Sequence, residues 1–164
     1  MPSFRTTRRV AHSAADMFAL VADVEKYPQF LPMCTGLDVR RRSTDARGRE
    51  VIVADMSVGY KAIRETFTSR VTLDREALKI LVEYVDGPFR HLENTWTFVD
   101  ETPVALPRSK IDFFIDYEFK SRMLGLLMGS LFDAAFRKFA EAFERRADAL
   151  YGRSAQQAGV APGA

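Results

Sequence analysis

The sequence predicts an α+β protein in which a curved antiparallel β-sheet wraps around one long C-terminal helix. Residues 37–120 contain six successive runs in which apolar and polar side chains alternate, the pattern of strands with one buried face. Residues 121–151 carry polar side chains at steps of three and four, which is the period of a helix. Because a sheet with one apolar face needs a covering layer, we expect the helix to supply it and a cavity to remain between them.

The composition favours a single domain with ordinary surface charge. The chain has 164 residues, and we place the domain at residues 1–151 and a disordered tail of small and polar residues at 152–164. A net charge of +2 favours an anionic partner only weakly, and no DNA partner is expected. Thirteen phenylalanines indicate a large aromatic interior.

The residues that carry catalysis or bind metals are sparse. Cys34 is the only cysteine, so neither an internal disulfide nor a cysteine-based metal cluster can form. His12 and His91 are the only histidines. No motif in the sequence places either one with carboxylates as a metal site or with Cys34 as a nucleophile. We therefore predict no catalytic residue and no metal site. No signal peptide is evident, which favours a soluble protein in a reducing compartment.

The N-terminal elements are short. Residues 4–10 form a polar strand, and Ser13 with Asp16 marks the start of a helix. Residues 23–34 are compact and aromatic, and Pro28 excludes one regular helix. We expect a short helix that ends before Pro28, then a tight aromatic turn.

The strands and the long helix follow. The alternating runs are residues 39–43, 50–60, 63–73, 78–84, 92–98 and 111–119. Within the helix, residues 123–132 are apolar nearly all round, whereas the later part is amphipathic. An all-apolar helix is expected to be buried on every side, and this one is too short to span a membrane.

Three stretches together carry a family resemblance: residues 23–34 (DVEKYPQFLPMC), 87–98 (GPFRHLENTWTF) and 113–139 (FFIDYEFKSRMLGLLMGSLFDAAFRKF). In this order they resemble the coenzyme Q-binding START-domain family. This family belongs to the polyketide cyclase/dehydrase-like superfamily, which includes the bacterial ribosome-association toxin. The resemblance covers roughly residues 3–150. It implies the helix-grip (START-like) fold with a lipid-sized internal cavity.

The resemblance also implies a function. We expect a lipid chaperone that binds a polyprenyl quinone, ubiquinone, and supports respiratory electron transport or quinone biosynthesis. Ubiquinone would be a bound ligand, and no cofactor is expected. One alternative is a toxin that binds the large ribosomal subunit and blocks subunit joining. A second is an aromatic polyketide cyclase-like enzyme. The family start at the first strand implies a bacterial, cytoplasmic protein. A peripheral contact with the inner membrane is a further expectation.

The cavity wall is expected to combine the aromatic turn, the inward strand faces and the apolar half of the helix. The predicted lining residues are Phe30, Leu31, Met56, Val58, Tyr60, Glu65, Phe67, Asn94, Trp96, Phe98, Phe113, Ile115, Tyr117, Phe119, Leu124, Leu127, Met128, Leu131 and Phe132. Alternation directs Glu65 and Asn94 inward, where either could contact a quinone carbonyl. Glu65 could instead lie at the rim or pair with Arg90.

Two surfaces are candidates for a membrane or ribosome contact. The family places the turn at residues 27–32 near the cavity mouth, where exposed Phe30 and Leu31 would touch a membrane. The alternative is that they pack against the sheet. The basic residues at 40–42, 47 and 49 could protect an edge strand, or contact anionic lipid or ribosomal RNA.

Overall fold

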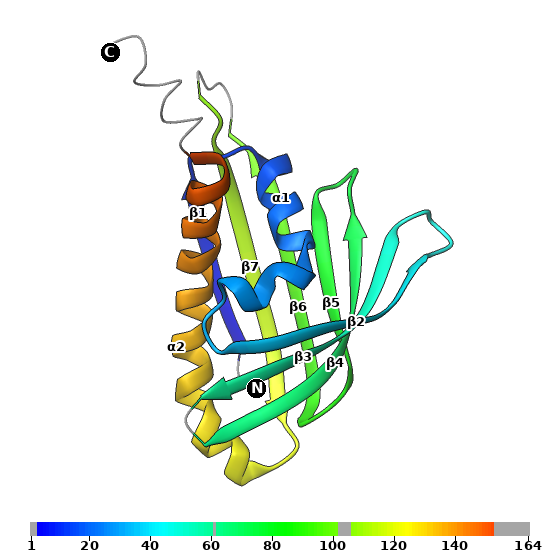
Figure 1. The fold of residues 1–164 in the computed structure, drawn as a ribbon, viewed down its shortest axis with the longest axis vertical. Coiled ribbons are helices and arrows are strands. Elements are labelled where there is room, and N and C mark those ends of the chain that lie inside the picture. Colours follow the sequence, from blue (N-terminus) through cyan, green and yellow to red (C-terminus); the bar gives the residue numbers. More distant parts are fainter. Residues whose placement is uncertain (1–2, 61, 102–105, 153–164) are drawn as a thin grey trace.

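The computed structural model describes residues 3–60, 62–101 and 106–152. Within them, one seven-stranded antiparallel sheet has the strand order β1-β7-β6-β5-β4-β3-β2, and the long helix α2 runs along it (Figure 1). The predicted α+β fold is confirmed. The elements in chain order are β1 (Ser3–Val10), α1 (Ala14–Ala22), the 3-10 helix η1 (Val24–Gln29), β2 (Cys34–Thr44), β3 (Glu50–Tyr60), β4 (Ile63–Asp74), β5 (Lys79–Asp86), β6 (Phe89–Asp100), β7 (Ser109–Phe119), α2 (Arg122–Ala147) and the short π-helix η2 (Asp148–Gly152).

The sheet is strongly curved. In Figure 1, β2, β3 and β4 cross the direction of β5, β6 and β7 at a steep angle. Register shifts accompany this bend, between Val39 and Arg41 in β2 and between Thr68 and Ser69 where β4 pairs with β5. An extra residue on one strand bends it and increases its twist. The concave face that results encloses space beside α2.

The first helix begins as predicted, but η1 does not end where expected. The Ser13 hydroxyl accepts a hydrogen bond from the Asp16 amide at 3.1 Å and caps α1. The helix η1 has six residues and contains Pro28, before which it was expected to stop. A proline this close to the end of a short helix removes only one hydrogen bond, so the turn can include it.

The turn after η1 is packed rather than exposed. Leu31 is buried, and the Phe30 ring contacts the Phe143 ring of α2 at a centroid distance of 5.2 Å. The expectation that Phe30 and Leu31 face a membrane is therefore wrong. The sequence left open that these side chains pack against the sheet, and the structure shows that Phe30 packs against α2 instead.

The first part of α2 is not buried on every side. Met123, Leu126 and Leu127 are 72%, 80% and 61% exposed, which corrects the prediction for residues 123–132. The helix lies along one side of the curled sheet, and in Figure 1 its first turns lie near the end of β3 and the start of β4. Met128 faces the sheet and is buried.

The predicted tail begins at a residue that the structure includes in a helix. Gly152, predicted to begin a disordered tail, is buried as the last residue of η2, and the rest of that tail lies outside the described residues. Among the described helices, none has both the length and the apolar character to cross a bilayer.

Candidate ligand cavity

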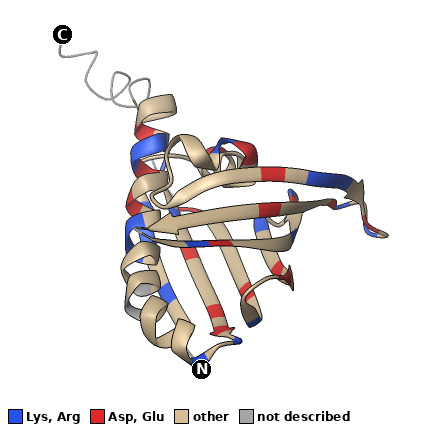
Figure 2. Ribbon diagram, turned by 60° about the horizontal axis from the view of Figure 1, so that its bottom comes forward, with Lys and Arg blue, Asp and Glu red and all other residues tan. Residues whose placement is uncertain are grey.

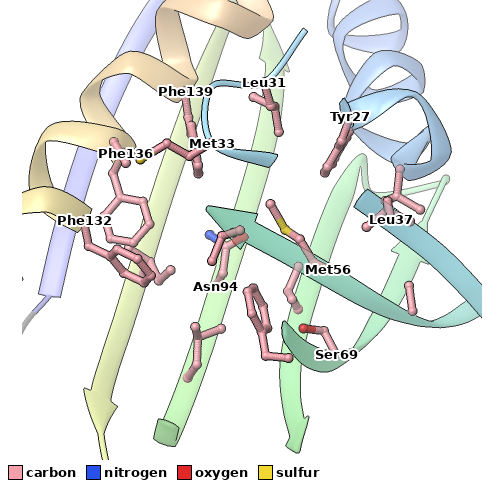
Figure 3. Close-up of a pocket in the computed structure, with 18 of the residues that line it drawn as sticks. Tyr27, Leu31, Met33, Leu37, Met56, Ser69, Asn94, Phe132, Phe136 and Phe139 are labelled. Carbon is pink, nitrogen blue, oxygen red and sulfur yellow. The ribbon is translucent and has the colours of Figure 1, made fainter. Parts of the chain in front are cut away.

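An apolar cavity of about 140 Å³ lies between the concave face of the sheet and α2 (Figure 3). Every strand from β2 to β7 contributes to its wall, together with η1 and the loop after it. The lining residues are Val24, Tyr27, Leu31, Met33, Leu37, Ala54, Met56, Val58, Gly59, Tyr60, Ile63, Phe67, Ser69, Val71, Ile80, Val82, Leu92, Asn94, Trp96, Phe113, Ile115, Met128, Leu131, Phe132, Ala135, Phe136 and Phe139. None of these described residues carries a carboxylate, imidazole, ammonium or guanidinium group.

The structure brings many of the predicted lining residues together. Those in the wall are Leu31, Met56, Val58, Tyr60, Phe67, Asn94, Trp96, Phe113, Ile115, Met128, Leu131 and Phe132. Tyr60, the last residue of β3, is also 43% exposed, so this part of the wall also faces solvent.

Other predicted residues lie elsewhere, for identifiable reasons. Leu127 faces solvent, and Phe30 packs on Phe143. The Phe98 ring packs edge-on against the Phe18 ring of α1, with ring centroids 5.8 Å apart. The corrected positions outside the wall are Phe30, Glu65, Phe98, Tyr117, Phe119, Leu124 and Leu127.

Tyr117 and Phe119 belong to an aromatic cluster below the cavity rather than to its wall. Phe89 stacks on Phe119 at 4.7 Å, and Phe132 of α2 lies 5.2 Å from the Phe119 ring. Tyr117 contacts Phe136 edge-on at 5.6 Å. These rings close the space between β6, β7 and α2, so no room is left there for a ligand.

Glu65 is half-buried at the β3–β4 end of the sheet, opposite Val58. Alternation does place it on the same strand face as Ile63 and Phe67. The strand reaches the cavity mouth at this point, so its side chain lies near the rim and outside the lining. Arg90 pairs with Glu118 at 3.4 Å, which does not support the alternative pairing with Glu65.

Asn94 does lie in the wall, and two hydrogen bonds fix its amide. Its Nδ2 donates to the Phe114 carbonyl oxygen, and its Oδ1 accepts from Trp96 Nε1, both at 2.8 Å. An indole N–H can only donate and a carbonyl oxygen can only accept, so the amide orientation is determined by its partners. Asn94 thereby holds Trp96 and β7 in place while it lines the cavity.

Several lining residues were missed although the sequence contained a signal for them. Ser69, Val71 and Leu92 occupy inward positions by the same alternation that placed Phe67 and Asn94. Phe136 and Phe139 lie on the amphipathic part of α2, which was not expected to reach the cavity. The loop residue Met33 adopts a positive φ of 67°, which no residue pattern predicts.

Two ionisable side chains of η1 and β2, Tyr27 and Cys34, have raised pKa values. Burial, and then the charges of Cys34 and Asp23, raise the pKa of Tyr27 far above its usual value, and its hydroxyl donates to the Val21 carbonyl. Burial also raises the pKa of the Cys34 thiol, which disfavours the reactive thiolate.

The two histidines lie in separate places, each beside one carboxylate. His12 is buried and contacts Asp148 at 2.7 Å, whereas His91 lies 3.5 Å from Asp116. Among the described residues, no group of three or more histidine, cysteine or acidic side chains is placed to hold a metal ion.

The charged residues gather outside the cavity. Figure 2 shows the β2–β3 hairpin extending from the body with several basic positions. Arg40 pairs with Asp55 at 2.9 Å, Arg49 pairs with Asp45 at 2.8 Å, and Arg42 pairs with Glu25. Much of the basic charge on this hairpin is thus matched by neighbouring acids.

A comparison with known families decides the relationship. Residues 10–144 match the family described as polyketide cyclase / dehydrase and lipid transport. The chain belongs to this family. The resemblance inferred from the three sequence stretches is therefore confirmed.

Named relatives fall into two groups. The chain is 36% identical to the ribosome association toxin RatA of Escherichia coli K12 over 92% of its length and 90% of that protein. It is 33% identical to the mitochondrial coenzyme Q-binding protein COQ10 of Drosophila melanogaster, over 82% of this chain and 53% of that protein. Both names describe binding or association rather than catalysis.

The fold also has a close counterpart among solved structures. A START superfamily protein from Mycobacterium smegmatis superposes with a TM-score of 0.73 over 90% of this chain and 98% of that one. Its sequence identity is 23%, so this likeness concerns the fold.

Proposed function

We propose that the protein binds a polyprenyl quinone such as ubiquinone in the cavity between the sheet and α2, without changing it chemically. The apolar cavity is the observation that carries the proposal. Its volume of about 140 Å³ is close to that of a cavity known to accept benzene, ~150 Å³. One ring fits inside, and an isoprenoid tail would leave past Tyr60.

A holding role fits the chemistry of the wall. Acid–base catalysis needs a titratable group within reach of the substrate, and the described wall offers only two tyrosines, of which Tyr27 is occupied by its bond to Val21. Affinity would come mainly from apolar burial at ~25 cal/mol per Å², less the cost of ordering the ligand. The relative named coenzyme Q-binding protein supports this ligand class. We place the protein in respiratory electron transport or quinone biosynthesis as a lipid chaperone.

The ligand would enter from a membrane at what we call the apolar end, formed by Tyr60, Met123, Leu126 and Leu127. All four are exposed, and Tyr60 lines the cavity. Exposed Lys120 and Arg122 flank the start of α2. Apolar side chains beside cations suit the surface of an anionic bilayer, where the tail can pass without crossing water. We therefore propose a peripheral location at a membrane.

Blocking the cavity tests the binding proposal. Ala54 is buried in the wall, so Ala54→Phe should fill the space and abolish saturable binding of a short-chain ubiquinone analogue while the protein still melts cooperatively. The matched control is Ala134→Phe, because Ala134 is exposed on α2. Fluorescence titration measures binding. Absence of saturable binding by the wild-type protein would contradict the proposed function.

Exchange kinetics test the proposed entry point. The double variant Met123→Ser, Leu126→Ser should slow stopped-flow transfer of a fluorescent quinone to phosphatidylglycerol vesicles, with little change in equilibrium affinity. Val99→Ser is the control, because Val99 is also apolar and exposed but lies near the end of β6, outside the apolar end. Added salt should reduce the advantage of anionic over neutral vesicles. Equal transfer rates for the double variant and the wild type would exclude this entry point.

Ribosome association is the second candidate function, and the identity to RatA over nearly the whole chain favours it. The internal pairing of Arg40, Arg42 and Arg49 weakens the most basic surface as an RNA contact. Sedimentation of ribosomes with added protein separates the two functions. On our proposal the 70S peak is unchanged, whereas accumulation of free subunits would favour the toxin-like role.

A further inference from the structure

We propose that the cavity recognises a ring with hydrogen-bond acceptors at two opposite edges, one bound by Ser69 Oγ and the other by the free N–H of Asn94. This inference rests on the proposed function and makes it more specific. It distinguishes a para-quinone ring from other apolar ligands of similar size.

Ser69 is a polar side chain in the cavity wall whose hydroxyl group lacks a hydrogen-bond partner among the described residues. It lies on β4 between the apolar residues Phe67 and Val71, is only 6% exposed, and its Oγ has no hydrogen-bond partner among the described residues. Figure 3 shows the hydroxyl oxygen directed into the pocket. Buried hydroxyls are nearly always paired, so an unpaired one in a cavity wall indicates a group that is supplied from outside.

Hydroxyl groups of the neighbouring residues on β4 are paired within the protein. Thr68 Oγ1 donates to Asp55 at 2.5 Å, and Thr66 shares a hydrogen bond with Ser57 at 3.0 Å. These bonds lie on the opposite face of the strand from the cavity. The missing partner of Ser69 is therefore a feature of the inner face, where the ligand would lie.

Asn94 supplies a second, oriented donor from β6. Its hydrogen bonds to the Phe114 carbonyl and the Trp96 indole use one of its two N–H groups and one side of its carbonyl oxygen. The orientation of the amide is fixed by these partners, so the remaining N–H is held in place in the cavity wall. A rigid donor of this kind suits a neutral acceptor such as a ketone oxygen.

The spacing of the two groups matches one ring. Asn94 pairs with Val82 of β5, and Val82 pairs with Val71 of β4, two positions from Ser69. Two strand spacings of roughly 10 Å and an offset of two residues, roughly 7 Å along the strand, separate the two backbones by roughly 12 Å. A hydrogen bond of ~2.9 Å at each end then leaves on the order of 6 Å between the acceptors. This spacing is close to the width of a six-membered ring with oxygens at opposite positions.

The reduced form of such a ring also fits. A serine hydroxyl can donate to a carbonyl or accept from a phenol, and the Asn94 N–H can donate to either oxygen. An anionic headgroup fits poorly, because the described wall contains no lysine, arginine or histidine to pair with it. The cavity chemistry therefore favours a neutral ring over a fatty acid or phospholipid headgroup.

The test removes the Ser69 hydroxyl and compares two ligands. Ser69→Ala should weaken binding of the short-chain ubiquinone analogue about two- to ten-fold and leave binding of an alkylbenzene with the same chain unchanged. Ser109→Ala is the matched control. Ser109 is also buried and its Oγ also lacks a hydrogen-bond partner among the described residues, but it lies in β7 outside the cavity wall, so both affinities should stay at the wild-type value.

The ligand-free proteins give an independent readout. Because Ser69 Oγ makes no bond in the absence of ligand, Ser69→Ala should melt at the same temperature as the wild type or higher. Equal quinone affinity of Ser69→Ala and a wild type that binds saturably overturns the inference and leaves the proposed function intact. An equal loss for quinone and alkylbenzene means that Ser69 only shapes the cavity, which also overturns it. If the wild type fails to bind quinone, both proposals fail.

Discussion

The two halves of α2 differ in hydrophobicity and in surroundings, and the more apolar half is the more exposed one. From Phe136 to η2, the helix is attached to the body by buried side chains and polar contacts, among them the Arg8–Glu144 pair at 2.6 Å and the His12–Asp148 contact at 2.7 Å. From Met123 to Leu127, apolar side chains face solvent. The comparison shows that one helix can combine a half that stabilises the fold with a half that remains available to a ligand or membrane.

The largest difference should appear in stability. Phe143 is buried against Trp96 and Tyr27, with ring centroids 5.3 Å away in both cases. Phe143→Ala should lower the free energy of unfolding by about 3–5 kcal/mol. Leu126→Ala, on the exposed half, should change it by less than about 0.5 kcal/mol. Urea denaturation measures both, and similar costs for the two variants would remove the distinction between the halves.

Introducing a negative charge should have different effects on the inner and outer faces of the exposed half of α2. Leu131 lines the cavity and is half-buried, whereas Leu127 is 61% exposed. Leu131→Asp should destabilise the protein by about 2 kcal/mol through lost apolar contact and a poorly solvated carboxyl group, and should abolish quinone binding. Leu127→Asp should fold like the wild type. Thermal melts of both variants check this, and a Leu127→Asp protein that does not fold would mean that residues 123–132 are enclosed after all.

Tyr27, which packs against the second half of α2, should make the stability of the protein fall at alkaline pH. Its ring contacts Phe143 and its hydroxyl donates to Val21, so Tyr27→Phe should cost about 1 kcal/mol at neutral pH. Burial raises the pKa of Tyr27 well above the ordinary 10.0. Above that ordinary value the unfolded chain loses the proton while the folded protein keeps it, so stability falls as pH rises. Denaturation at several pH values should show a steeper alkaline loss for the wild type than for Tyr27→Phe. Parallel curves would contradict the burial of this ring.

The smallest effect concerns the ion pair that joins β1 to the packed half. Both Arg8 and Glu144 are partly exposed, so Arg8→Ala should cost no more than about 1 kcal/mol, and less at high salt. Arg145→Ala is the control, because among the residues that the structure describes Arg145 forms an ion pair only with Glu141 on the same helix, at 3.7 Å. Denaturation at two salt concentrations distinguishes them. A cost for Arg145→Ala equal to that of Arg8→Ala would show that the link to β1 adds nothing.

The periodicity of the sequence was sufficient to predict the fold. Alternation within a strand records which side chains face the core, so the six strands from β2 to β7 and the inward positions of Asn94 and Phe113 followed directly. The cap at Ser13 was visible because its side chain acts on a residue three positions away. Local patterns of this kind need no knowledge of distant contacts.

The limits of the cavity could not be predicted in the same way. Whether Leu127 is covered depends on where the sheet ends in space, and whether Phe30 is exposed depends on Phe143, which is far away in the chain. Ser69 could have been assigned inward by alternation, but its missing partner is evident only when all surrounding strands are in place. A sequence pattern shows which residues share a face of a helix or strand, but the tertiary packing determines which of these faces contact each other.

The pairing of β1 with β7 has a consequence for how the chain is made. Arg5 and Asp112, which join these strands at 2.8 Å, are 107 positions apart. The strands from β2 to β6 pair with their sequence neighbours and can assemble as they emerge during synthesis, whereas β1 must wait for β7. During that interval β1 is an unpaired strand, and its arginines Arg5, Arg8 and Arg9 discourage pairing with other nascent chains. The same side chains that later form ion pairs thus protect the protein from aggregation before it is complete.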